Sequence, residues 1–279
     1  MRSPIGVAMC ACVLVFCSTA LAGGRETGFL NRVVTRDGNR YAYQVYVPAT
    51  YRGDTKWPVI LFLHGAGERG EDGLLQTDVG IGPSIRNHAD RFPCIVVMPQ
   101  CRPKAIWADA MTDMAVDALD RAIKEFNGDS RRVSVVGLSM GGFGTWYLAA
   151  KYPTKFAALV PICGFMRPTF DGKPLSSRGY DLPDPLLTSI GLPDGPEVYK
   201  AAAQRIGKTP VWIFHGAADD TVPVTESRAM AEALKEAGGT VKYTEYEGVK
   251  HNSWEKALDE PELMPWLLSQ RLGVGASNK

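Results

Sequence analysis

Residues 133–153 read VSVVGLSMGGFGTWYLAAKYP and contain the most informative pattern in the chain. The apolar run 133–137 predicts a buried strand, and the residues after Met140 predict a helix. Between them, Gly137, Ser139 and Gly141 form the motif G-x-S-x-G. Where a strand meets a helix, this motif is typical of a strained turn that exposes the serine hydroxyl above the sheet. We therefore interpret Ser139 as a nucleophile, rather than as an incidental serine in a glycine-rich turn.

The rest of the chain alternates between strand and helix patterns. Nearly all-apolar runs at 58–63, 94–98, 133–137, 157–162 and 210–214 predict buried parallel strands, and 41–47 and 241–246 alternate as half-buried strands do. Helical periodicity is present at 110–126, 225–237 and 262–272. Strands that alternate with helices of this length predict an α/β fold with a mostly parallel central sheet flanked by helices. Because no repeat or linker interrupts the pattern, we expect one domain at 23–279.

A second glycine motif, G-x-G-x-x-G, occupies residues 65–70, directly after the predicted strand 58–63. In a dinucleotide-binding protein these glycines open a helix and present backbone amides to a diphosphate. Here Glu68, Glu71 and Asp72 would repel a diphosphate, and no apolar helical stripe follows. The sequence therefore does not favour a nucleotide cofactor.

A nucleophilic serine requires a histidine as its base and an acid that orients the histidine. In α/β enzymes with this turn, the chain order is serine, acid, histidine. The chain has four histidines, and His64, His88 and His215 all lie upstream of the required position. His251 is the one that follows both Ser139 and the acids after the next strand, and we predict it to be the base.

Four stretches carry a resemblance to a known group of proteins: LFLHGAGERG (61–70), VVGLSMGGFGTW (135–146), VWIFHGAADDTVP (211–223) and HNSW (251–254). They resemble the α/β-hydrolase superfamily and, within it, the secreted esterase branch. That branch includes dienelactone-hydrolase and phospholipase/carboxylesterase-like proteins, feruloyl-esterase-like enzymes and predicted peptidases. The resemblance spans about residues 40–268 and implies the α/β-hydrolase fold.

The resemblance also implies the remaining site residues. The family pattern H-G-x-x-D-x-x-V-P falls on 215–223, which implies Asp219 as the acid, with Asp220 as its near rival. The H-G-x sequence at 64–66 implies an oxyanion loop. Its donors would be the N–H groups of Ala66 and of Met140, the residue after the nucleophile. No metal ion or organic cofactor is implied.

The expected function is hydrolysis of carboxylic esters through an acyl-enzyme, with Ser139, His251 and Asp219 as a catalytic triad. The substrate would be a small-molecule or polysaccharide-linked ester. One alternative is a serine peptidase on the same triad. Another is a non-catalytic carbohydrate-binding protein on a hydrolase scaffold, although a complete triad argues against it. Trp107, Trp146 and Trp254 lie near the motifs, either in a substrate pocket or in the core.

Residues 1–22 have the pattern of a signal peptide, with basic Arg2, a mostly apolar stretch 5–16 and an A-x-A cleavage site at 20–22. Because the apolar stretch is too short to span a bilayer, we expect a secreted or periplasmic protein without a membrane span. Without this segment, acidic and basic residues balance, so electrostatics favours neither nucleic acid nor an anionic membrane as partner. The pattern does not indicate an oligomeric state.

Three cysteines follow the predicted signal peptide: Cys94, Cys101 and Cys163. An odd number allows at most one disulfide, and Cys94–Cys101 is the nearest pair. None lies in C-x-x-C spacing, so the sequence does not predict a zinc or redox site.

The segment 164–208 is far longer than a usual crossover between strands, and it is rich in proline. It leaves the sheet where α/β folds bind ligands. Its apolar side chains argue against the alternative of a disordered surface insert. We therefore predict an insertion that packs over Ser139 as a cap.

Overall fold

The computed structural model describes residues 26–170, 173–182 and 185–273. Its strands are β1 (Gly28–Arg36), β2 (Asn39–Val47), β3 (Trp57–Leu63), β4 (Ile95–Pro99), β5 (Gly128–Leu138), β6 (Ala158–Ile162), β7 (Thr169–Phe170), β8 (Lys173–Pro174), β9 (Val211–Gly216) and β10 (Val241–Tyr246). Its α-helices are α1 (Ile81–Asn87), α2 (Asp109–Glu125), α3 (Met140–Lys151), α4 (Val198–Ile206), α5 (Thr225–Glu236), α6 (Trp254–Asp259) and α7 (Leu263–Ser269). Short 3-10 turns are η1 (Ala66–Glu68), η2 (Leu75–Thr77), η3 (Ala89–Arg91), η4 (Leu175–Arg178) and η5 (Thr188–Ile190).

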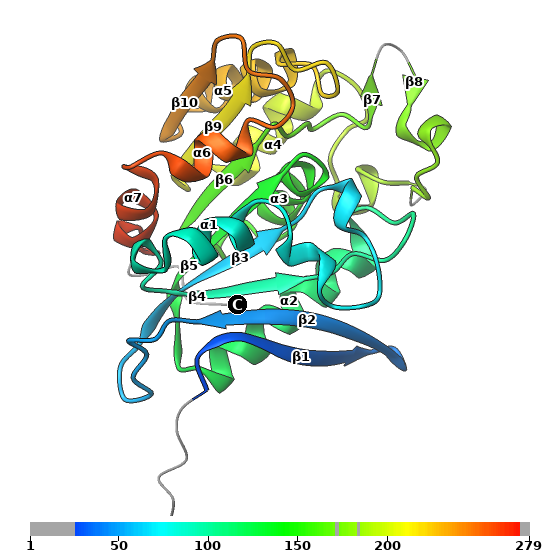
Figure 1. Cartoon of the computed structure of the whole chain (residues 1–279). Coiled ribbons are helices and arrows are strands. Elements are labelled where there is room, and N and C mark those ends of the chain that lie inside the picture. Colours follow the sequence, from blue (N-terminus) through cyan, green and yellow to red (C-terminus); the bar gives the residue numbers. More distant parts are fainter. Residues whose placement is uncertain (1–25, 171–172, 183–184, 274–279) are drawn as a thin grey trace, which may run out of the picture.

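Eight strands form one sheet in the order β1-β2-β4-β3-β5-β6-β9-β10 (Figure 1). The pairs β1–β2 and β2–β4 are antiparallel, and every other neighbouring pair in this sheet is parallel. The predicted α/β-hydrolase fold with a mostly parallel sheet is therefore confirmed.

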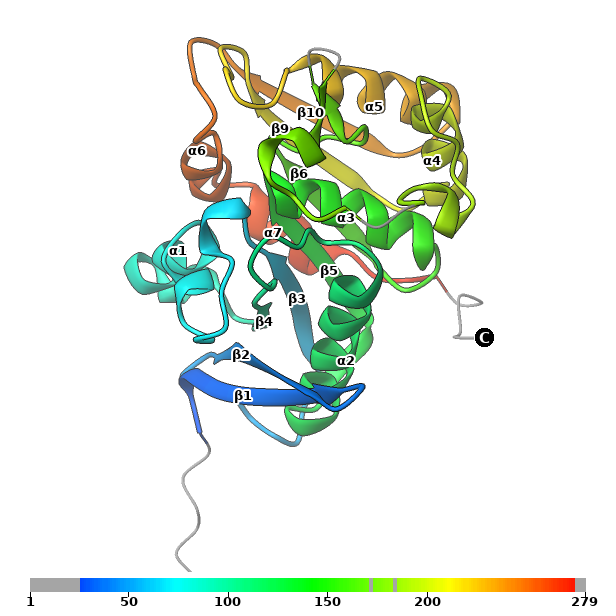
Figure 2. The same ribbon diagram turned by 90° about the vertical axis from the view of Figure 1, so that its right-hand side faces the viewer.

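Helices cover both faces of the sheet, as Figure 2 shows. One core lies under α2, α3, α4 and α5, and the other lies under α1, α6 and α7. Strand β3 illustrates why its sequence is apolar throughout: Val59 and Leu61 belong to the first core, while Ile60 and Phe62 belong to the second. Successive side chains of a strand point to opposite faces, so a strand buried on both faces needs apolar residues at every position.

The sequence did not predict β1, α1, α6 or the short strands β7 and β8, and the reason is clearest for β1 and α1. Strand β1 is an edge strand, and its side chains are mostly half-buried, so its sequence GFLNRVVTR lacks the apolar run of a central strand. Helix α1 has seven residues and contains both glycine and proline, so its sequence IGPSIRN lacks a clear helical signal.

The Cys94–Cys101 disulfide that the spacing suggested is not formed, and both residues are buried free thiols. The two cysteines flank β4, whose five residues are extended between them. Cys94 lies in the core under α1, α6 and α7, whereas Cys101 lies in the opposite core. At about 3.3 Å per extended residue, their Cα atoms are much farther apart than the roughly 7 Å that a disulfide allows.

The insertion 164–208 is packed against the body of the protein in its described parts. Leu186, Leu187 and Leu192 are buried in the core that contains α2 and α3. The Asp181 N–H donates to the Lys104 carbonyl at 2.9 Å, which ties the insertion to the loop before α2. The small hairpin of β7 and β8 lies beyond the main sheet (Figure 1). These contacts argue against a free surface loop.

No helix within the described ranges is long and apolar enough to cross a membrane. The predicted signal peptide, residues 1–22, lies outside the described residues.

Candidate active site

Ser139 occupies the sharp turn between β5 and α3. Its backbone has φ 53° and ψ −115°, a strained conformation for a residue other than glycine. The two glycines of the motif are sterically required: a Cβ on Gly137 would lie 2.0 Å from the Gly141 carbonyl oxygen, and one on Gly141 would lie 1.9 Å from the Leu63 carbonyl oxygen. The motif therefore lets β5 and α3 pack closely around a half-exposed serine.

Ser139, His251 and Asp219 form a continuous hydrogen-bonded chain. His251 Nε2 lies 2.9 Å from Ser139 Oγ, and His251 Nδ1 lies 2.8 Å from Asp219 Oδ2. Asp219 follows β9, and His251 lies in the loop between β10 and α6. Parallel strands end at the same edge of a sheet. Ser139 and Asp219, which lie 112 and 32 positions before His251 in the sequence, therefore meet His251 at that edge.

The surroundings of Asp219 stabilise its ionised form. Burial of the carboxyl raises its pKa, but hydrogen bonds from His215 and His251 and from the N–H groups of Val222 and Thr221 outweigh burial and hold the pKa well below its ordinary value. An ionised carboxylate can accept a hydrogen bond from the Nδ1–H group of His251, which leaves Nε2 free to accept the serine proton.

Asp220 lies in a different environment. Its side chain is exposed and pairs with Lys250 at 3.2 Å. That ion pair lowers the pKa of Asp220, but within the described residues the carboxylate makes no contact with His251. The structure thus brings Asp219, and not Asp220, to the imidazole.

His64 holds the loop that follows β3. It is fully buried, its Nε2 accepts the Cys101 N–H at 2.9 Å, and its Nδ1–H donates to the Gly65 carbonyl at 2.6 Å. In a planar trans peptide the carbonyl and the next N–H point in opposite directions, so this bond turns the Ala66 N–H away from His64. The His64 carbonyl in turn accepts the Trp107 indole N–H at 2.9 Å.

Other polar groups of the same loop also have protein partners. Arg69 Nε donates to the Ala66 carbonyl at 2.9 Å, and Gln100 Nε2 donates to the Glu68 carbonyl at 3.2 Å. In contrast, no protein acceptor for the N–H groups of Ala66 or Met140 occurs within the described part of the chain. Two unpaired N–H groups beside a nucleophile are suited to stabilise a negatively charged oxygen.

Two buried groups near Ser139 were not assigned to the site from the sequence: the thiol of Cys163 and the carboxyl of Glu68. Cys163 has φ 41° and directly follows β6, and burial raises the pKa of its thiol. The Glu68 side chain is 12% exposed, its Oε2 makes no hydrogen bond with a described residue and lies 4.0 Å from His64 Nδ1, and burial raises the pKa of its carboxyl. The burial of Cys163 and Glu68 is produced by segments that are distant in the sequence, and it therefore leaves no local signal.

The same region contains a set of atoms with metal-ligand chemistry. Within the described residues, one ligand atom each from Cys163, Asp219 and His251 lies within 4.8 Å of the others. However, His251 Nδ1 and Asp219 Oδ2 already share a hydrogen bond, which a metal ion would have to replace. The arrangement therefore favours proton transfer over metal binding.

The three tryptophans near the motifs fall into two groups. Trp107 and Trp146 are fully buried in the core under α2–α5. Trp254 is half-buried, and its ring packs edge-to-face against the His251 ring, with 5.5 Å between centroids. Of the three, Trp254 is therefore the one placed to meet a substrate.

Comparisons with known proteins agree with this fold. An uncharacterized secreted protein of Arthroderma benhamiae is 30% identical over 204 residues, a match that covers 70% of this chain and 21% of that protein. Feruloyl esterase B of Neurospora crassa is 26% identical over 225 residues, covering 74% of this chain and 73% of that protein. The crystal structure of a thermostable esterase is 30% identical with a TM-score of 0.70, covering 87% of this chain and 63% of that chain.

The chain thus spans about a fifth of the fungal secreted protein but most of the feruloyl esterase. A model of the prolyl oligopeptidase family matches residues 105–264, more than half of the chain, and this range includes Ser139, Asp219 and His251. The chain therefore belongs to the prolyl oligopeptidase family and has the α/β-hydrolase fold.

Proposed function

We propose that this protein is a serine hydrolase of carboxylic esters, with Ser139 as nucleophile, His251 as general base and acid, and Asp219 as the residue that orients His251. The observation that carries the proposal is the hydrogen-bonded chain Ser139–His251–Asp219, with spacings of 2.9 and 2.8 Å. The unpaired amides of Ala66 and Met140 supply the oxyanion hole.

In this mechanism, Ser139 Oγ attacks the ester carbonyl while His251 Nε2 takes the hydroxyl proton. The tetrahedral intermediate places its negative oxygen at the Ala66 and Met140 N–H groups. Its collapse breaks the bond to the alcohol oxygen, which receives the proton from His251, and leaves Ser139 acylated. Water then attacks the acyl-enzyme, giving its proton to His251, and the second collapse releases the acid and restores the Ser139 hydroxyl.

An ester substrate is favoured by the feruloyl esterase relative, which this chain matches over most of both lengths. The second candidate, a serine peptidase on the same residues, is favoured by the family match itself. Both candidates share the acyl-enzyme, so the alcohol or amine that leaves distinguishes them.

The test is to compare methyl esters with anilides of the same acyl group, feruloyl in one pair and peptidyl in the other. The assay uses the purified protein and a Ser139→Ala control. Ester turnover that depends on Ser139 and exceeds amide turnover supports the proposal. Turnover that is confined to the anilides favours the peptidase, and ester turnover unchanged in the variant excludes Ser139 as nucleophile.

We further propose that the insertion 164–208 borders the acyl side of the site. Arg69, which donates to the Ala66 carbonyl, also lies over the Tyr180 ring at 4.7 Å. The insertion therefore contacts the oxyanion loop at Tyr180. Because Leu186 and Leu187 are buried, a deletion would also remove core contacts, and Tyr180→Ala is the sharper variant. A change in the preference for acyl length supports this role, and an unchanged preference in the folded variant opposes it.

Export of the protein after removal of residues 1–22 also remains a proposal. It is supported by the leader-like sequence and by the name of the fungal relative as a secreted protein. N-terminal sequencing of the protein recovered outside the cytoplasm tests it, with Gly23 as the expected first residue.

A further inference from the structure

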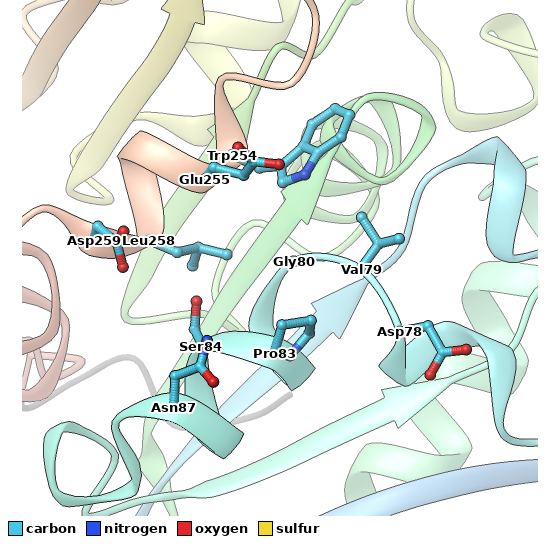
Figure 3. Close-up of a pocket in the computed structure, with 10 residues that line it drawn as sticks. All are labelled: Asp78, Val79, Gly80, Pro83, Ser84, Asn87, Trp254, Glu255, Leu258 and Asp259. Atoms are coloured by element: carbon cyan, nitrogen blue, oxygen red, sulfur yellow. The ribbon is translucent and has the colours of Figure 1, made fainter.

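A hollow of about 300 Å³ lies between α1 and α6 (Figure 3). Its lining consists of Asp78, Val79, Gly80, Pro83, Ser84, Asn87, Trp254, Glu255, Leu258 and Asp259. In Figure 3, Trp254 lies on one side of the hollow, and Pro83, Ser84 and Asn87 lie on the opposite side. The volume is at the lower end of the range for small-molecule sites.

The hollow adjoins the reacting groups at one end. Trp254, which forms part of its wall, packs edge-to-face against the His251 ring. At Gly80, a Cβ would lie 2.6 Å from the Leu138 side chain, and Leu138 directly precedes Ser139. The lining continues along α1, whose seven residues span about 10 Å at 1.5 Å per helical residue.

The position of the hollow indicates which part of a substrate it would receive. In acyl transfer, the general acid gives its proton to the leaving oxygen, so that oxygen must lie within hydrogen-bond reach of His251 Nε2. A group attached to the leaving oxygen extends past His251 toward Trp254. The hollow therefore lies on the alcohol side of the ester.

The lining offers both donors and acceptors of hydrogen bonds. Its free polar groups are the Ser84 hydroxyl, the Asn87 amide, the Trp254 indole N–H and the carboxylates of Asp78 and Glu255. None of these groups makes a hydrogen bond or ion pair with another residue in the described ranges. The carboxylate of Asp259 is different, because it lies 3.8 Å from Arg91.

This combination of hydrogen-bond donors and carboxylates in the lining discriminates among classes of alcohol. An anionic alcohol would meet three carboxylates, and none of the ten lining residues is Lys, Arg or His. A cationic alcohol would match the carboxylates but would offer no hydrogen-bond acceptor to the donors of Ser84, Asn87 and Trp254. An uncharged polyhydroxylated alcohol both donates and accepts, and its apolar faces can pack on an indole ring.

We propose that this hollow is the alcohol subsite and that it takes the sugar moiety of a sugar ester, with Ser84, Asn87 and Trp254 as its determinants. The inference rests on the proposed ester hydrolysis, because the sugar is the leaving group of that reaction.

The experiment compares three acetate esters that differ only in their alcohol: glucose 6-acetate, ethyl acetate and acetylcholine. The wild-type protein is expected to show a kcat/KM for glucose 6-acetate at least about tenfold above that for ethyl acetate, because several hydrogen bonds to the sugar form in the hollow. Equal values for these two esters would overturn the proposal. A preference for acetylcholine would also overturn it and would show that the hollow recognises positive charge.

Two variants and a matched control test whether the preference for glucose 6-acetate arises at the hollow. Ser84→Ala and Asn87→Ala should each lower the ratio of kcat/KM for glucose 6-acetate over ethyl acetate by about fivefold, the effect of one lost hydrogen bond. Thr154→Ala removes an exposed hydroxyl that lines a different hollow and should leave the ratio unchanged. Ratios that do not differ between Ser84→Ala, Asn87→Ala and Thr154→Ala would refute the subsite.

Binding separates this inference from the proposed function. If the wild-type protein hydrolyses neither the acetates nor the feruloyl and peptidyl methyl esters, the ester proposal fails, and saturation-transfer NMR with methyl glucoside still tests the subsite. Contact of the glucoside with Ser139→Ala protein that is weakened by adding Asn87→Ala supports the subsite. Absence of contact, or contact unaffected by Asn87→Ala, refutes it.

Discussion

Protonation of His64 is expected to destabilise the fold in mild acid. The imidazole is fully buried, and its Nε2 accepts the Cys101 N–H at 2.9 Å, so a proton on Nε2 would face another donor. Burial lowers the pKa of His64 from 6.5 to about 4, against the opposing effect of the hydrogen bond to the Gly65 carbonyl. His64 therefore remains neutral in the folded protein at pH values where the unfolded chain is already protonated.

The expected loss follows from the difference between the two pKa values. Between pH 6.5 and about 4, the unfolded chain binds a proton at this position and the folded protein does not, so stability falls as the pH falls. Above pH 6.5 both states are neutral and His64 gives no pH dependence. One pKa unit corresponds to about 1.4 kcal/mol, so the full shift amounts to roughly 3 kcal/mol of unfolding free energy.

The assay is urea unfolding of the wild type, His64→Gln and His88→Gln at pH 7.5 and pH 4.5. Because glutamine does not titrate, His64→Gln should lose about 2 to 3 kcal/mol less than the wild type between the two pH values. His88 is exposed, and His88→Gln should follow the wild type. An identical loss in wild type and His64→Gln would refute the reasoning. If His64→Gln does not fold, NMR titration of the wild-type ring decides, and a midpoint near 6.5 refutes it.

Four further substitutions test the site. Ser139→Ala should lower kcat by about 1,000-fold or more with an unchanged melting temperature, measured by ester turnover and calorimetry. Asp219→Asn should lower kcat by about 1,000- to 10,000-fold because it holds the imidazole in the wrong tautomer, whereas Asp220→Asn should change kcat by less than about threefold, and the reverse order would assign the acid to Asp220. Gly141→Ala should abolish soluble folded protein, because its Cβ would lie 1.9 Å from the Leu63 carbonyl oxygen, and a variant with wild-type melting would contradict that steric argument.

The fold could be predicted because its signals are local. Strands such as β3, β4 and β9 are buried on both faces and read as continuous apolar runs. The turn at Ser139 was recognisable because close backbone packing requires glycine at both ends of the motif: Gly137 lies against the Gly141 carbonyl, and Gly141 lies against the Leu63 carbonyl of the neighbouring strand. Strand β1 carries no such signal, since an edge strand meets the core with only part of its surface.

The roles of the buried histidines could not be predicted. Chain order excluded His64 and His215 as the base, but it said nothing of their partners. His64 contacts the N–H of Cys101, and His215 contacts the Ser227 hydroxyl and the Val222 carbonyl and lies 3.1 Å from Asp219. Cys101 and Ser227 lie outside the motifs that contain these histidines, so the contacts that position the oxyanion loop and His215 appear only when the chain is packed.

The same physical distinction explains why the candidate triad could be predicted from the sequence and the substrate could not. Ser139, Asp219 and His251 each follow a strand of one parallel sheet, so the order of strands along the chain is enough to bring them to one edge. No such rule predicts the hollow beside them. Its walls, α1 and α6, are separated by about 170 residues in the sequence, and α1 lacks a clear helical pattern. Trp107 and Trp146 are fully buried and Trp254 is half-buried, and this difference is set by packing rather than by the local sequence. Substrate choice therefore depends on surfaces that non-local contacts build, while the chemistry depends on a topology that local patterns reveal.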